Sequence, residues 1–79
     1  MKGVYLLWMI GSLHNSKEWR LVNVFASLDA AKAYDVPARQ IQYWRETSHD
    51  DGQPFWEIGY PADDSAVKEL LIEFKEIQH

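Results

Sequence analysis

The chain has 79 residues, of which 47% are apolar and 25% charged, and its formal net charge is −4. This length and composition predict one globular domain over 1–79 and argue against a disordered chain. The sequence contains no cysteine, which excludes a disulfide framework and thiolate chemistry and makes a reducing cytoplasm the expected compartment. The acidic balance also argues against a duplex-DNA-binding role, because such domains are usually basic.

The first predicted element is a strand over Val4–Ile10, in which both alternating sets of side chains are apolar. This run is much shorter than the ~20 residues of a membrane span, so we expect no membrane association. A polar loop over 11–18 should lead into a second strand, Trp19–Ala26, which is rich in β-branched and aromatic residues. The two strands are expected to form an antiparallel hairpin.

A short helix is predicted after the hairpin. Ser27 is a favourable N-cap, and Leu28–Tyr34 contains strong helix formers, with Asp29 in the first turn where the helix dipole favours a carboxylate. Pro37 disfavours a helical conformation at the residue before it, so the helix should end early. The alternative is that Asp35 caps a second helix that runs through Pro37.

A second hairpin is predicted from the alternating pattern of Arg39–Thr47 and from Phe55–Tyr60, with Asp50-Asp51-Gly52 as the turn. A two-residue loop would place Glu46 opposite Glu57, and like charges directly opposed are unfavourable. A three-residue loop with Gly52 in the left-handed conformation instead places Arg45 opposite Glu57. We therefore expect the second register.

The last predicted element is an amphipathic helix of about 14 residues, because apolar side chains after Ser65 recur at helical spacing. These side chains are Val67, Leu70, Leu71, Phe74 and Ile77. The resulting order is β-β-α-β-β-α. The expected fold class is α+β, a two-layer sandwich with a four-stranded antiparallel sheet and the helices on one face.

The chemical motifs of common enzyme classes are not found. His49-Asp50-Asp51 lies in a predicted turn, where aspartate is expected in any case, so we assign no metal site. The serines occupy loop, turn or cap positions, and none lies in a nucleophile elbow. The four glycines are too dispersed for a phosphate-binding loop. We expect a protein that is not an enzyme and that carries no cofactor.

The first part of the chain has a recognisable pattern: Val4-Tyr5-Leu6-Leu7-Trp8, the polar loop, Leu21-Val22-Asn23-Val24-Phe25 and then Ser27-Leu28-Asp29-Ala30-Ala31. This pattern resembles small uncharacterised phage and bacterial proteins in which a hairpin runs into a Ser-capped helix. It covers about the first 35 residues and implies no activity, and the second half of the chain departs from it. It suggests a phage or mobile-element accessory protein. The small size, acidic charge and aromatic content fit a phage-encoded protein that acts on a host protein in the host cytoplasm.

Our first functional hypothesis is a protein-interaction module. Two short helices cover only one face of a sheet, and both faces of this predicted sheet carry large apolar side chains, so one apolar face should stay free for a protein partner or a second copy of the chain. Trp19, beside the polar loop, is the tryptophan expected at the surface, whereas Trp8 is expected in the core. The candidate interface residues are Tyr5, Leu7, Trp19, Arg20, Ile41, Tyr43, Arg45 and Phe55.

The alternative hypothesis is single-stranded nucleic-acid binding through residues 39–45. This segment and nearby Lys32 interleave basic and aromatic side chains, a combination that single-strand binders use for phosphate contact and base stacking. The acidic net charge and the lack of an RRM or KH signature make nucleic acid the less favoured partner.

Overall fold

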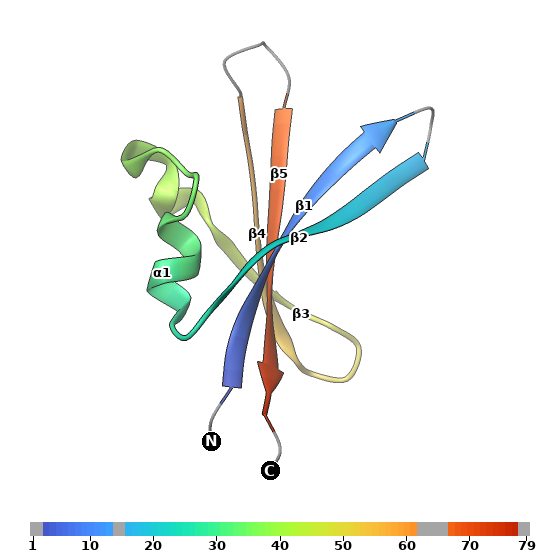
Figure 1. The fold of residues 1–79 in the computed structure, drawn as a ribbon, viewed down its shortest axis with the longest axis vertical. Helices are drawn as coiled ribbons and strands as arrows, with labels where there is room; N and C mark the ends of the chain where they lie inside the picture. The colour runs from blue at the N-terminus through green and yellow to red at the C-terminus, as the bar shows by residue number, and fades with distance from the viewer. Residues whose placement is uncertain (1–2, 14–15, 62–66, 78–79) are drawn as a thin grey trace.

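The computed structural model describes residues 3–13, 16–61 and 67–77. Five strands form a single antiparallel sheet in the order β2-β1-β5-β4-β3 (Figure 1). In chain order the elements are β1 (Gly3–Leu13), β2 (Ser16–Phe25), α1 (Leu28–Ala33), the 3-10 helix η1 (Ala38–Tyr43), β3 (Arg45–Ser48), β4 (Pro54–Pro61) and β5 (Val67–Glu76).

The predicted α+β sandwich with a four-stranded sheet and the order β-β-α-β-β-α is wrong, because the last element is a strand. β5 lies at the centre of the sheet, where it pairs with β1 on one side and β4 on the other. The apolar residues of 67–77 fit a helical period, yet Leu70, Ile72 and Phe74 also alternate on one face of a strand. Backbone pairing on both sides outweighs the helix preference of this segment.

The first hairpin is longer than predicted. β1 continues to Leu13 and β2 already begins at Ser16, so most of the polar segment 11–18 belongs to the strands rather than to a loop. A register shift between Leu7 and Trp8 marks a bulge in this pairing. Beyond Ile10, β1 pairs only with β2 among the described strands, and polar residues are tolerated there because the pairing with β5 has ended.

The short helix α1 is confirmed where the N-cap signal placed it. The Ser27 side chain accepts a hydrogen bond from the backbone N–H of Ala30 at 3.2 Å, and Ala31 turns fully inward. Tyr34 is the C-cap, and the following Asp35 has a positive φ of 55°, so the chain leaves the helix as the proline predicted.

The predicted strand 39–47 is wrong in its first half. Residues 38–43 form the 3-10 helix η1, which follows Pro37 and begins with a hydrogen bond from the Gln40 N–H to the Pro37 carbonyl at 2.8 Å. The alternative of a second helix at Pro37 is closer to the structure, although Pro37 rather than Asp35 is the N-cap. The alternation from Arg45 onward does form a strand, β3.

The register predicted for the second hairpin is confirmed: Arg45 lies opposite Glu57 and the two side chains form an ion pair. The turn closes with hydrogen bonds from the His49 N–H to the Gln53 carbonyl and from the Gly52 N–H to the His49 carbonyl, each 2.9 Å. Gly52 has φ +87°, the left-handed conformation that the three-residue loop requires.

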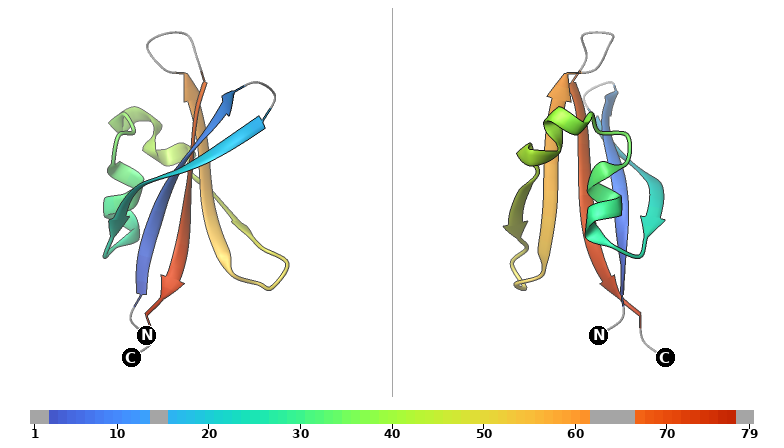
Figure 2. Two further views of the ribbon diagram at one scale, coloured as in Figure 1. Left: turned by 45° about the vertical axis from the view of Figure 1, so that its right-hand side comes forward. Right: turned by 90° about the vertical axis from the view of Figure 1, so that its left-hand side faces the viewer.

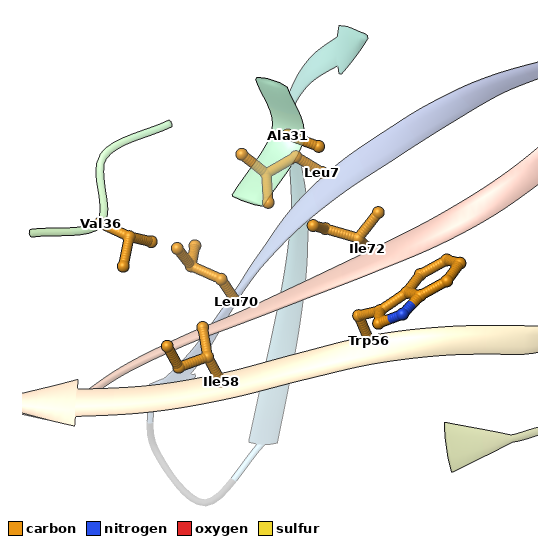
Figure 3. Close-up of a cluster of buried hydrophobic side chains, with 7 residues drawn as sticks. All are labelled: Leu7, Ala31, Val36, Trp56, Ile58, Leu70 and Ile72. Carbon is orange, nitrogen blue, oxygen red and sulfur yellow. The ribbon is translucent and has the colours of Figure 1, made fainter. Parts of the chain in front are cut away.

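The core lies between the sheet and the chain segment that carries α1 and η1, which both pack against the same face (Figure 2). We call this the covered face. Figure 3 shows the strand residues pointing toward Ala31 of α1 and Val36. The buried cluster consists of Leu7, Ala31, Val36, Trp56, Ile58, Leu70 and Ile72.

Candidate functional site

The opposite side of the sheet carries no helix in the described part of the chain, and we call it the bare face. Because side chains alternate along a strand, β1 sends Leu7 to the covered face and Trp8 to the bare face. Cross-strand partners share a face, so Leu21 and Leu71, the partners of Trp8, lie with it. The buried Leu71 accordingly stands outside the core cluster.

The half of the bare face formed by β1 and β2 is apolar. On the edge strand β2, Trp19, Leu21 and Val24 are 51%, 47% and 44% exposed. Beside them lie the half-buried side chains of alternate β1 residues. We call this surface the β1–β2 patch, and its members are Val4, Leu6, Trp8, Ile10, Trp19, Leu21 and Val24.

Trp8 and Trp19 pack edge to face within this patch, with ring centroids 6.2 Å apart and an interplanar angle of 68°. The indole N–H of Trp8 is buried and has no hydrogen-bond acceptor among the described residues. A buried donor without a partner costs about 1–3 kcal/mol, so this tryptophan occupies its place through apolar contact rather than through its polar atom. Trp8 was expected in the core and instead lies half-buried on the bare face.

The other half of the bare face, formed by β3, β4 and β5, is polar and largely self-paired. The Arg45 guanidinium bonds to the Glu57 carboxylate, and the His49 imidazole lies 3.7 Å from the Glu73 carboxylate. His49 also stacks on Phe55, with ring centroids 4.3 Å apart. Arg45, Glu57 and Glu73 therefore have partners within the chain, whereas Glu69 and Lys75 of β5 lie exposed on the same face.

A shallow groove of about 420 Å³ lies where β3 stops pairing with β4. Tyr43 and Gly59 line it together with the carboxylates of Glu57 and Glu69. Glu57 is already paired with Arg45, and no histidine, serine or threonine is among the described residues that line the groove.

The predicted interface residues do not converge on one surface. Trp19 and Phe55 lie on the bare face, although Phe55 is half-buried under His49. Leu7 is fully buried in the core and is not available at the surface, and Tyr5 packs against Trp56 and Phe74 on the covered face.

The remaining predicted residues lie near the edges of the sheet. Arg20 is exposed on β2, and its partner Met9 faces the core, so Arg20 projects on the covered side. Ile41 packs against the core from η1, whereas Tyr43 in the same helix is 61% exposed. Arg45 is exposed and paired with Glu57.

Sequence reasoning missed most of the β1–β2 patch. Val4, Leu6 and Ile10 were seen as the second apolar set of their strand, but nothing in the strand itself distinguishes the two sets. The signal lies in the partner strand: opposite these residues β5 places Lys75, Glu73 and Glu69, which mark the solvent side.

The segment considered for nucleic-acid binding is partly engaged within the fold. The indole N–H of Trp44 donates to the backbone carbonyl of Lys32 at 3.0 Å, and Trp44 packs against the core. Arg45 pairs with Glu57. Tyr43 and Arg39 remain exposed.

No family model, curated protein or solved structure matches this chain. Neither of the two helices in the described residues is long and apolar enough to cross a membrane. Within the same part of the chain, no group of three or more histidine and carboxylate side chains is arranged to hold a metal ion.

Proposed function

We propose that this protein is a non-enzymatic protein-interaction module and that the β1–β2 patch is its docking surface. The single observation that carries the proposal is the clustering of Trp19, Leu21 and Val24 on the bare side of an edge strand, each close to half exposed. Large apolar side chains gathered at neighbouring surface positions mark interaction sites in soluble proteins.

The composition of the patch fits a protein partner. Its centre contains two tryptophans and aliphatic side chains, and charged residues lie on the neighbouring strands β4 and β5, as in interfaces with an apolar centre and a polar rim. Removing this apolar area from water contributes about 25 cal/mol per Å², and tryptophans are frequent binding hot spots. Single-stranded nucleic acid has weaker support, because Trp44 and Arg45 are engaged within the chain.

Site-specific photo-crosslinking in cells that produce the protein tests the proposal. A benzophenone amino acid replaces Leu21 in the patch or, as the matched control, Tyr34 beside α1, which is exposed to a similar degree (47% and 41%). We expect a discrete protein adduct from position 21 and none from position 34. A Val24→Lys substitution in the same chain should abolish the adduct. Equal crosslinking at both positions, or no adduct at position 21, contradicts the proposal.

A further inference from the structure

The outer edge of β2 is open. β2 is ten residues long and pairs only with β1 among the described strands. The strand at the other edge of the sheet, β3, has only four residues, and such a short edge strand offers few backbone groups for pairing with another chain. A long edge strand with exposed apolar side chains is a template for pairing with another strand, because its outward N–H and C=O groups lack partners.

The accessible part of this edge lies in the projecting arm of the first hairpin. The pairing of β1 with β5 ends at Ile10, and from there the arm diverges from β4 and β5 (Figure 1). The register shift of β2 falls between Leu21 and Asn23, the partners of Trp8 and Leu7. The regular stretch of β2 is therefore 16–21, and Glu18 and Trp19 lie at its middle.

The charged residues of this stretch favour one register for antiparallel pairing between the β2 strands of two copies. In an antiparallel pair with two-fold symmetry, the central residue of the register lies opposite the same residue of the other copy. Every register that is centred on a residue in this way keeps the apolar side chains of both copies on the same face. Centring such a register on Glu18 or on Arg20 places like charges directly opposite each other. Centring it on Trp19 places Glu18 of each copy opposite Arg20 of the other, with Lys17 opposite Leu21 in the outer pairs.

The two charges are free to make this contact. Glu18 and Arg20 are both exposed, and neither forms an ion pair with another described residue. Their β1 partners are Gly11 and Met9, so both side chains project on the covered side of the arm. Trp19 projects on the opposite side, where the two Trp19 rings of such a pair would face each other. Charge complementarity thus selects the register centred on Trp19, which lies within the regular stretch 16–21.

We propose that two copies of the chain associate through antiparallel pairing of their β2 strands, centred on Trp19. The inference rests on the proposed function, since it names a second copy of this chain as the partner at the edge of the β1–β2 patch. The pairing continues the five-stranded sheet of one copy into that of the other and joins the two patches into one surface. Opposite charges directly across neighbouring strands stabilise such pairing.

Sedimentation velocity of the purified chain, from about 1 μM to about 1 mM, tests the inference over the range in which weak dimers assemble. We expect a reversible monomer–dimer equilibrium. Glu18→Arg places arginines opposite each other at both flanking pairs, and Arg20→Glu does the same with glutamates. Each single variant should raise the dissociation constant about tenfold.

Two rescue arms make the test specific for this register. The double variant Glu18→Arg/Arg20→Glu restores both attractive pairs, so it should dimerise like the wild type. The two single variants, mixed in equal amounts, should form a heterodimer that native mass spectrometry resolves, because each carries the charge that the other lacks. Circular dichroism melts of the dilute monomers confirm that every variant is folded.

The unfavourable outcomes are separable. A wild-type chain that stays monomeric at about 1 mM overturns the inference, while an adduct from position 21 in cells would still support a different protein partner. A dimer whose affinity is unchanged in both single variants overturns the β2 register. Loss of affinity without rescue by the double variant or the mixture overturns the Glu18–Arg20 pairing.

Discussion

The indole N–H of Trp44 donates a hydrogen bond to the backbone carbonyl of Lys32 at 3.0 Å. This contact joins the residue that ends η1 to the last turn of α1. The two helices belong to one connection that crosses the covered face from β2 at one edge of the sheet to β3 at the other (Figure 2). Trp44 therefore fixes how the connection packs on the core, and with it which face of the sheet stays bare.

Replacing this tryptophan should destabilise the fold more than its loss of size alone predicts. Trp44→Phe leaves the partly buried Lys32 carbonyl without its donor, which costs about 1–3 kcal/mol. Urea denaturation of dilute protein measures the change in unfolding free energy. The control is Trp19→Phe, an exposed tryptophan with no such hydrogen bond, which should change stability by less than about 1 kcal/mol. Equal losses in the two variants would show that the hydrogen bond contributes nothing.

Trp8→Phe should be tolerated better than Trp44→Phe, although both remove the same atoms. The Trp8 N–H is buried without an acceptor among the described residues, so its removal relieves a desolvation cost that offsets the lost ring contacts. We expect a stability within about 1 kcal/mol of the wild type in the same urea experiment. A larger loss for Trp8→Phe than for Trp44→Phe contradicts this account of the two indoles.

The elements that sequence reasoning placed correctly depend on neighbours a few residues apart. The Ser27 cap, the left-handed Gly52 and the Arg45–Glu57 register each follow from local backbone or charge constraints. The segment 67–77 could not be assigned in this way, because its apolar residues satisfy both a helical and a strand pattern. The choice is made by β1 and β4, which supply backbone partners on both sides.

The wrong assignment of 67–77 as a helix also affected the predicted interface residues. Once 67–77 is taken as a covering helix, the two apolar sets of β1 cannot be assigned to a face, and Leu7 enters the interface list although it is fully buried. The exposure of Trp19 was predicted from its polar neighbours alone, and the structure agrees with it at 51%. Edge position, which makes β2 available for pairing, depends on the whole sheet order and has no local signal.

The covered and bare faces should respond differently to the loss of apolar side chains. Ile72 is 0% exposed in the central strand, so Ile72→Val should cost about 0.5–1.5 kcal/mol and Ile72→Ala about 2–5 kcal/mol through the cavity left behind. Leu21→Ala on the bare face is the control, with an expected loss below about 1 kcal/mol. Thermal or urea unfolding at low protein concentration measures both. A large loss at Leu21 would place part of the core on the bare face.

The Arg45–Glu57 ion pair should add little to stability, although it matches the register of the second hairpin. The Arg45 side chain is 75% exposed and that of Glu57 is 38% exposed, so water and salt screen the interaction. Arg45→Ala should cost less than about 1 kcal/mol, and the loss should shrink further in high salt. A loss above about 2 kcal/mol that is insensitive to salt would show that the pair anchors β3.

The turn should hold the register of this hairpin more strongly than the ion pair does. Gly52 has φ +87° and open space around the position of a Cβ atom, so the cost of Gly52→Ala is conformational, about 1–2 kcal/mol. Gly11 in β1 also has open space, but its φ is not positive, and Gly11→Ala should therefore stabilise the strand by about 0.5–1 kcal/mol. The same substitution thus has opposite signs at two equally uncrowded positions. Unfolding free energies of the two variants, measured side by side in urea, would contradict this explanation if they shifted in the same direction.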